Sequence, residues 1–420
     1  MNPVRVLVTL PFYGGSLPVG RYAAQALLDE GQIVEVFEAP AFFSAFSALK
    51  TLRVGVDRLA QLENSFLHTL SQAIYAKVES FEPDLLLCLA QAPLDRATLR
   101  RLERDKVVTA MWFVEDYQVF SYWRAFAPCY DFFFTIQKEP FLDLLRAEGT
   151  KGSYLPLAAL PSFHRPLELD AAERRRYGAD IAFLGAGYPN RRMAFRQLTG
   201  FDFKIWGSDW EGDGLLARHL QAGGARIEPE EAVKIFNATR INLNLHSSVR
   251  ADTLISRGDF VNPRTFELAA CGAFQLTDQR ALMPELFADG ELAIFTSMDE
   301  LRAAIDHYLA HPDKRAAMAE KTRTRVLADH TYQHRMRSLL DTIRAARPDW
   351  PAPRRRLALP DHAPEDLRRE IEQLLTTLNL PADVDFADLI TRIRQQSGQL
   401  NSLETSLLFL DEWRKQYKQG

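Results

Sequence analysis

The chain repeats one pattern twice: short, continuous apolar runs alternate with stretches of helical period. In the first 160 residues these runs fall at 4–10, 33–37, 85–89, 107–113 and 132–136. A second series begins near residue 180, with runs at 180–184, 203–206, 240–245 and 273–276. Continuous apolar strands separated by helices are typical of parallel sheets covered on both faces, so the sequence predicts two successive α/β domains.

Two changes of composition mark the predicted domain boundaries. A run at 154–159 predicts another strand, and the polar stretch 168–176 after it is typical of a solvated connector. Further on, Pro348, Pro351, Pro353 and Pro360 surround three consecutive arginines, a pattern typical of a linker. The predicted organisation is a first domain at 1–158, a second domain at 159–347, and a linker with a helical tail at 348–420.

The tail has helical periodicity throughout, with one apolar stripe at 389–393 and another at 400–410. One interpretation is a plain helical appendage. The other is a surface through which the chain forms a homo-oligomer, and the pattern alone does not separate them.

Composition excludes several classes of protein. A net charge of −4 argues against a nucleic-acid binder that relies on gross positive charge, and 47% hydrophobic residues exclude global disorder. No apolar run is long enough to span a membrane. Three widely spaced cysteines without a CxxC motif predict neither a disulfide framework nor a metal site. With no signal-peptide pattern at the N-terminus, we expect a cytoplasmic protein.

Candidate site residues are sought just beyond the strands, where open α/β sheets bind ligands. Gly14 and Gly15 follow the first run and precede a helix expected at 21–30, an arrangement that suits either close approach of a ligand or a tight turn. After the run at 107–113, Glu115 and Asp116 are adjacent carboxylates. One of them could act as a base, and acids that merely begin a helix are the structural alternative.

In the second domain, Gly185 and Gly187 follow a strand, and a helix with Asn190 as its N-cap would carry Arg191 in its first turn. Backbone amides and guanidinium groups in this pattern suit a diphosphate. Further along, Arg264 could hold a phosphate, and Glu267 near the start of the same helix could accept hydrogen bonds from a ribose diol. Trp206 could offer a flat surface to a base, or it could be a core residue.

The stretch 262–274 resembles the nucleotide-sugar motif of the retaining, sucrose-synthase-like glycosyltransferases of the GT-B fold. Two glutamates seven residues apart mark that motif; Glu267 falls on the second, and Asp259, a shorter acid, on the first. More closely, residues 1–345 resemble the CgeB-like (spore-maturation type) glycosyltransferases. The motifs that carry this resemblance are Trp112 with Glu115-Asp116, 131–137, 154–156, 180–191, Trp206-Gly207, 240–245, 262–272 and 330–335.

The resemblance implies a GT-B fold, with two Rossmann-like domains facing a cleft, and transfer of a sugar from a nucleotide diphospho-sugar to a glycan or protein. It implies no cofactor and no metal, and Asp116 or Glu115 as catalytic residues. The expected donor-binding residues are Gly185, Gly187, Arg191, Trp206, Gly207, Asn244, His246, Asp259, Asn262, Arg264 and Glu267. The expected acceptor-binding residues are Gly14, Gly15, Trp112 and Tyr117.

Three alternatives stay open at this point. A nucleotide-sugar epimerase shares the GT-B fold but needs acids and a histidine around one sugar carbon. A non-catalytic nucleotide-sugar-binding or scaffold protein is compatible with Asp259 in place of glutamate and with the helical tail. A dinucleotide-dependent oxidoreductase is disfavoured because GxGxxG followed by an acid is absent.

Overall fold

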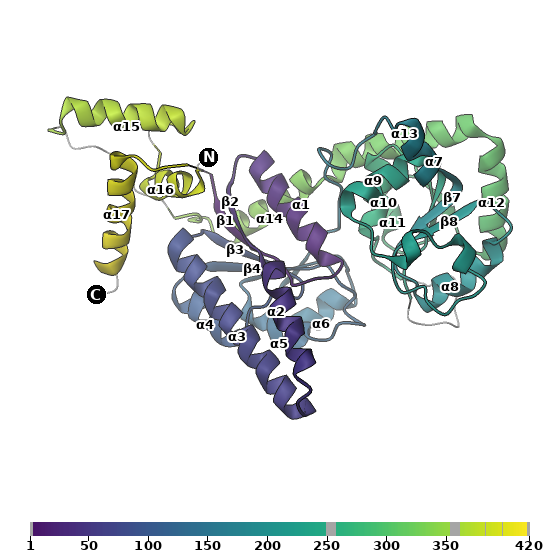
Figure 1. The fold of residues 1–420 in the computed structure, drawn as a ribbon, viewed down its shortest axis with the longest axis horizontal. Helices are drawn as coiled ribbons and strands as arrows, with labels where there is room; N and C mark the ends of the chain where they lie inside the picture. Colours follow the sequence, from purple (N-terminus) through teal and green to yellow (C-terminus); the bar gives the residue numbers. More distant parts are fainter. Residues whose placement is uncertain (1–2, 249–257, 353–361, 383, 397, 418–420) are drawn as a thin grey trace.

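The computed structural model describes residues 3–248, 258–352, 362–382, 384–396 and 398–417 (Figure 1). They form two parallel β-sheets flanked by helices, followed by three helices near the C-terminus. The first sheet has the strand order β2-β1-β3-β4-β5-β6, and the second has the order β11-β10-β9-β7-β8. The predicted architecture, two α/β units followed by a helical C-terminal extension, is confirmed.

The first sheet is covered by helices on both faces, as its mostly apolar strands require. Its strands are β1 (Arg5–Thr9), β2 (Ile33–Phe37), β3 (Leu85–Leu89), β4 (Val108–Phe113), β5 (Phe132–Thr135) and β6 (Gly152–Tyr154). Its helices are α1 (Ser16–Asp29), α2 (Phe43–Ala48), α3 (Val56–Phe81), α4 (Arg96–Arg104), α5 (Trp123–Phe126) and α6 (Phe141–Ala147), with short 3₁₀ turns η1 (Ala39–Phe42), η2 (Leu49–Leu52) and η3 (Ala127–Cys129). Alternate residues such as Leu85 and Leu86 enter two different cores, one on each face.

The second sheet follows the same plan. Its strands are β7 (Ala179–Leu184), β8 (Phe203–Trp206), β9 (Thr239–Asn244), β10 (Gln275–Asp278) and β11 (Ala293–Phe295). Its helices are α7 (Ala171–Tyr177), α8 (Pro189–Phe195), α9 (Pro229–Ala238), α10 (Pro263–Ala270), α11 (Met283–Leu286), α12 (Met298–Ala310) and α13 (Pro312–Asp329). The 3₁₀ turns are η4 (Arg196–Leu198), η5 (Ala217–His219) and η6 (Ala222–Gly224).

Four local predictions are wrong. The strand expected at 154–159 ends at Tyr154, where β6 stops. The stretch expected to be a connector contains α7, which a capping box between Asp170 and Glu173 stabilises. Asn190 lies inside α8 rather than at its N-cap, because its buried amide donates to the His246 carbonyl at 2.9 Å. The first helix begins at Ser16, five residues before the expected start.

The chain returns to the first sheet through α14 (Tyr332–Ala346), which packs along α1 (Figure 1). Tyr332 and Leu339 join the apolar core between α1 and the first sheet. Arg335, which is buried, donates from Nε to the Pro156 carbonyl at 2.8 Å. This helix therefore returns the chain from the second sheet and packs it against the first.

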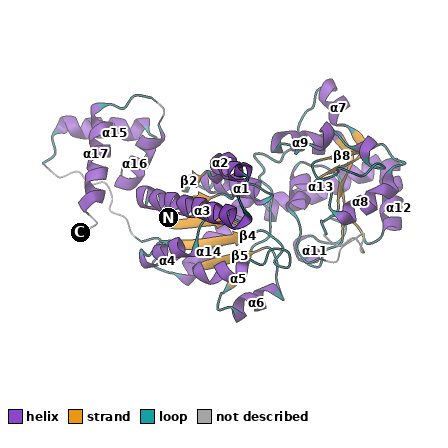
Figure 2. Cartoon of the chain, turned by 60° about the horizontal axis from the view of Figure 1, so that its bottom comes forward, coloured by secondary structure: helices purple, strands orange, loops and turns teal. Residues whose placement is uncertain are grey.

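The C-terminal helices α15 (Glu365–Thr377), α16 (Phe386–Gln395) and α17 (Ser402–Tyr417) form a small core of their own beside the first sheet, far from the second (Figures 1 and 2). Arg5 on β1 is buried, donates from Nη2 to the Phe81 carbonyl at 2.7 Å, and forms an ion pair with Asp388 on α16. The tail is thus docked on its own chain. Self-association through it, and the exact boundaries of the domains, stay predictions.

Candidate functional site

A pocket of about 420 Å³ lies between the two sheets, at the carboxyl ends of their strands. The start of α1 forms one wall, and the loops after β7 and β8, the segment 226–236 and the start of α10 form the rest. Five of the predicted site residues line it: Gly15, Gly185, Gly207, Arg264 and Glu267. The structure therefore brings residues of both domains to one site.

The start of α10 supplies the charged side chains of this pocket. Asn262 caps the helix, accepting at Oδ1 from the Thr265 amide at 3.1 Å. Glu267 lies in the second turn rather than at the helix start, is 8% exposed, and pairs with Arg264 at 2.6 Å. The Arg264 guanidinium also lies 4.6 Å from the centre of the Phe236 ring, which fixes its position in the wall.

Two aromatic side chains around Glu267 were not predicted from the sequence. His164, in the segment between the sheets, is 2% exposed, and its Nε2 lies 3.8 Å from Oε1 of Glu267. Its Nδ1 accepts from the Leu160 amide at 3.1 Å, so the ring proton sits on Nε2, facing the carboxylate. Burial lowers the pKa of His164, which keeps the ring neutral. Tyr22 of α1 packs edge-on against this ring, and burial, with the Glu267 charge second, raises the pKa of its phenol.

The glycines after β7 and β8 pack two loops against each other. The amides of Gly185 and Gly187 donate to the carbonyls of Trp206 and Ser208, each at 3.0 Å. A Cβ on Gly187 would lie 2.1 Å from the Asp209 carbonyl oxygen, and one on Gly207, whose φ is +111°, would lie 2.6 Å from that of Gly185. These contacts contradict the expectation that the amides of Gly185 and Gly187 face a diphosphate, although Gly185 and Gly207 still border the pocket.

Arg191 and its neighbour Arg192 hold the same loops in place through hydrogen bonds to backbone carbonyls. Arg191 donates to the carbonyls of Leu245 and Ala186, at 2.9 and 3.0 Å, and burial lowers the pKa of its guanidinium to about 10. Arg192 donates to the Gly187 carbonyl at 2.8 Å, among others. Arg191 does not line the pocket, so its predicted contact with the diphosphate is not supported by the geometry.

Both tryptophans expected at the site lie in the core instead. Trp206 is 2% exposed and packs against Tyr177 beneath the second sheet, so it offers no surface to a base. Trp112 is fully buried, and its Nε1 donates to the Leu155 carbonyl at 3.1 Å. Their indole rings stabilise the two sheets rather than bind an acceptor or a donor.

His246, Asn244 and Asn262 form a buried network under the start of α10. His246 Nδ1 lies 2.7 Å from Oδ1 of Asp278, and its Nε2 accepts from the Asn262 amide at 2.9 Å. The Asn262 side chain donates to Asn244 Oδ1 at 2.8 Å. His246 and Asn244 are buried and outside the pocket lining, so they position α10 rather than reach a ligand.

Glu115 and Asp116 have separate surroundings although they are adjacent. Glu115 accepts from the Tyr122 hydroxyl at 2.9 Å and from the Gln91 amide, and burial raises the pKa of its carboxyl. Asp116 Oδ1 accepts from the Gln118 amide at 2.9 Å, while Oδ2 accepts no hydrogen bond from the described residues. Of the two carboxylates, Asp116 is therefore the one with an oxygen that no described residue binds.

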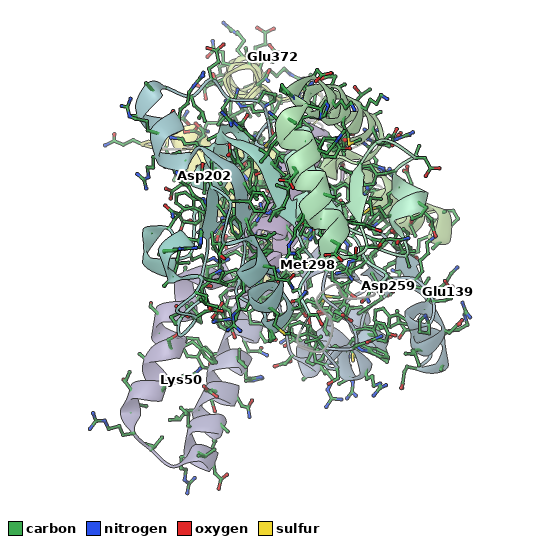
Figure 3. All side chains as sticks on the ribbon, turned by 90° about the vertical axis from the view of Figure 1, so that its right-hand side faces the viewer. Lys50, Glu139, Asp202, Asp259, Met298 and Glu372 are labelled. Carbon is green, nitrogen blue, oxygen red and sulfur yellow. The ribbon has the colours of Figure 1, made fainter. Side chains whose placement is uncertain are left out.

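Asp116 and Asp259 approach each other across the domain interface through Gln137, a residue that the sequence did not single out. Gln137 is 1% exposed; its amide nitrogen lies 2.9 Å from Asp259 Oδ1 and 3.4 Å from Asp116 Oδ1. Its own Oε1 accepts from the Tyr117 amide at 3.0 Å. The Tyr117 ring stacks on Phe141 at 4.6 Å. The carboxylates of Asp116 and Asp259 thus converge on one amide; Figure 3 labels Asp259.

The loop of Gly14 and Gly15, in the first domain, contacts the second domain beside the pocket. Gly14 has a φ of +99°, and its carbonyl accepts from Arg226 Nη2 of the second domain at 3.2 Å. A Cβ on either glycine would meet no atom within 4 Å, so space remains next to this loop. Arg226 also lines the pocket and adds a second guanidinium to it.

Two searches of the described part of the chain were negative. No group of three or more His, Cys, Asp or Glu side chains there is arranged to hold a metal ion. None of its helices combines the length and hydropathy needed to cross a membrane.

Comparisons with known proteins gave matches in sequence and in fold. Residues 190–341 match the family model described as glycosyl transferase-like. The spore protein CgeB of Bacillus subtilis is 24% identical over 253 residues, which cover 58% of this chain and 77% of CgeB.

Solved structures share the fold. Sucrose-phosphate synthase from Thermosynechococcus elongatus superposes with a TM-score of 0.56 at 13% identity, covering 82% of this chain and 99% of that one. HepE from Anabaena, crystallised with UDP and glucose, gives a TM-score of 0.55 at 10% identity, covering 81% and 100% of the two chains.

Fold, site and matches together define the chain as a glycosyltransferase of the GT-B class. The chain resembles the CgeB-like glycosyltransferases, as the motifs in its sequence predicted.

Proposed function

We propose that the donor of this glycosyltransferase is a nucleotide diphospho-sugar bound in the pocket between the sheets, and that its acceptor is a glycan or a protein. The observation that carries the proposal is the pocket itself. It combines a carboxylate held by an arginine (Glu267 and Arg264) with a second guanidinium (Arg226) and an apolar wall.

The pocket offers a complementary surface for each part of such a donor. Glu267 can accept hydrogen bonds from a ribose diol, since its two oxygens are fixed by Arg264 and faced by His164. Arg264 and Arg226 can bind the diphosphate, and Ile227 supplies apolar surface for a base. HepE, which has the same fold, was crystallised with UDP-glucose, and this supports the donor class.

For the transfer step we assign the base to Asp116, because its Oδ2 accepts no hydrogen bond within the described part of the chain and it approaches Asp259 of the other domain. The acceptor hydroxyl forms a bond to the anomeric carbon and gives its proton to Asp116, while the bond from that carbon to the diphosphate oxygen breaks. Arg264 and Arg226 stabilise the charge on the leaving diphosphate, so the proposal needs no metal or cofactor. The space beside Gly14 and Gly15 is the proposed acceptor entrance.

A thermal-shift panel with UDP, GDP, CDP, dTDP, ADP and NAD tests the donor class. A ligand at 100 times its dissociation constant adds roughly 2.7 kcal/mol to the free energy of unfolding. We expect one nucleoside diphosphate to stabilise the protein and Glu267→Ala to remove that shift. Glu231→Ala is the matched control, because Glu231 also pairs with an arginine of the same domain, Arg176, but lies outside the pocket.

The outcomes separate the proposal from its alternatives. Stabilisation by NAD alone would favour a dinucleotide-dependent enzyme. A folded protein that no nucleotide stabilises, or an equal loss in Glu231→Ala, would contradict the donor site. Binding of a nucleotide diphospho-sugar without hydrolysis or transfer, in the presence of candidate acceptors, would favour a scaffold role.

A further inference from the structure

A pair of helices projects from the first sheet, and it packs against a core of that sheet only at its base, through Phe46, Phe66 and Leu67. It consists of α2, η2 and the first half of α3, and Figure 3 labels Lys50 on it (see also Figure 1). Between residues 41 and 69 no side chain is buried, and the first buried residue of α3 is Leu70. We call residues 41–69 the arm and residues 50–58, at its end, the tip.

The tip combines exposed aliphatic side chains with unpaired cations. Leu52, Val54 and Val56 are 53%, 44% and 83% exposed. The tip also contains Lys50, Arg53 and Arg58 against one acid, Asp57, so three positive charges less one negative give a local charge of +2, whereas the whole chain carries −4.

The cations of the tip are available to a partner. Within the described part of the chain, no carboxylate forms an ion pair with Lys50, Arg53 or Arg58, and Arg58 donates only to the neutral Gln61, at 3.1 Å. Aliphatic groups left in water next to free cations indicate a partner that is apolar and negatively charged.

The base of the arm contacts the loop at the mouth of the pocket. The ring of Phe43 lies 4.9 Å from that of Tyr13, and Phe46 stacks on Phe12 at 5.1 Å. Tyr13 is followed directly by Gly14, whose carbonyl binds Arg226 across the interface. The arm is therefore joined at its base to the loop that borders the proposed acceptor entrance.

We propose that the tip docks this glycosyltransferase on a lipid bilayer that contains anionic lipids. Leu52, Val54 and Val56 would enter the interfacial region while the three cations contact the headgroups. A protein partner fits less well, since stable interfaces take roughly 800 Å² and 20–30 residues per partner, and the tip is a projection of nine residues. A deformable surface needs no such area. The acceptor would then be presented at the membrane surface.

Co-sedimentation of the full chain with vesicles tests this docking. We expect binding to vesicles of phosphatidylcholine with about a third phosphatidylglycerol, weakening with salt, and little binding to phosphatidylcholine alone. The variant Lys50→Gln/Arg53→Gln/Arg58→Gln should lose about a hundredfold in partitioning, because each cation contributes roughly fivefold. Val56→Asp should also weaken binding.

Matched controls are available elsewhere on the chain. Leu215→Asp changes an apolar side chain of the second domain that is 64% exposed, and Phe409→Asp changes one on α17 that is 69% exposed. Both should bind vesicles like the unaltered protein. In a Val56→Trp variant, tryptophan fluorescence should shift to the blue on adding anionic vesicles.

Three results would overturn the proposal. The first is no sedimentation of the folded, unaltered chain with anionic vesicles. The second is an equal loss of binding in the tip variants and the controls. The third is a dimer, seen by light scattering, that the tip variants abolish, because the tip would then bind a second copy. None of these readouts depends on nucleotide binding, so they are independent of the proposed function.

Discussion

Two segments of the second domain contain similar residues and use them in opposite ways. In the loop that runs into α8, Arg191 and Arg192 donate to backbone carbonyls, and the amides of Gly185 and Gly187 donate to the neighbouring loop. At the start of α10, the side chains of Arg264 and Glu267 bind each other and line the pocket. A glycine- and arginine-rich loop after a strand can therefore serve only to hold loops together. A ligand site needs polar atoms that the backbone has not already satisfied.

The first domain contains the same contrast in two adjacent residues. Both oxygens of Glu115 accept hydrogen bonds from Gln91 and Tyr122, whereas Asp116 keeps Oδ2 free of partners among the described residues. If the contrast is correct, the chemistry of transfer depends on Asp116 and the local structure on Glu115.

Substitution of these two carboxylates is the prediction with the largest effect. Asp116→Asn should reduce kcat by about 10²–10⁴ with unchanged donor affinity, because a general base is lost. Glu115→Gln keeps the size of the side chain and should retain most activity. Transfer kinetics with the identified donor, together with titration of that donor, measure both. Full activity in Asp116→Asn would place the base elsewhere.

His330 resembles Glu115 in that its polar atoms are all bonded within the protein: both ring nitrogens have hydrogen-bond partners. We therefore expect it to affect stability at acid pH. Its Nε2 lies 2.7 Å from the Leu286 carbonyl, its Nδ1 2.8 Å from Arg335, and burial lowers its pKa from 6.5 to about 4. As the pH falls, the unfolded chain takes up this proton first. The stabilisation is therefore complete above pH 6.5 and lost towards pH 4, by about 3 kcal/mol at most.

Chemical denaturation at a series of pH values measures this loss. His330→Gln should show a flatter dependence of the free energy of unfolding between pH 6.5 and 4 than the unaltered protein. Identical slopes in the two proteins would show that His330 does not titrate as its burial requires.

The bridge of Gln137 between the domains gives the smallest expected effect. Gln137→Met keeps the volume but removes the amide that Asp259 and Asp116 share. Loss of one such hydrogen bond costs about 1 kcal/mol, or roughly fivefold. We expect this fivefold loss in the efficiency of transfer (kcat/KM). The affinity for the free nucleoside diphosphate should not change, because Gln137 does not line the pocket. Steady-state kinetics beside calorimetric titration would separate the two.

Much of the fold could be predicted from the sequence, because buried parallel strands are continuous apolar runs. The strands at 33–37, 85–89 and 203–206 agree with their predicted limits to the residue. The predicted strand at 154–159 was wrong because most of its residues are buried but do not continue the sheet beyond Tyr154. Ala159 forms a single bridge with Thr331 instead. Apolar character reports burial, not which backbone groups pair.

The site was less predictable, because its parts come from segments far apart in the chain. His164 and Tyr22 reach Glu267 from the segment between the sheets and from α1, and neither belongs to a local motif. Trp112 and Trp206 lie in the last residues of β4 and β8, close to where ligand-binding residues lie, but the pleat turns both into the core. Only Arg226 carried a sequence signal, since it follows the glycine pair at 223–224 in a loop after β8.

The contrast between the two arginine segments can be tested by one measurement, calorimetric titration of the stabilising nucleoside diphosphate into Arg264→Ala and Arg192→Ala. Arg264→Ala should weaken binding about 10- to 100-fold, because a charged hydrogen bond to the ligand is lost. Arg192→Ala should lower the free energy of unfolding by about 1–3 kcal/mol, since it leaves carbonyls without donors, and keep the affinity. Unchanged affinity in Arg264→Ala, or a loss in folded Arg192→Ala, would contradict this account of the donor site.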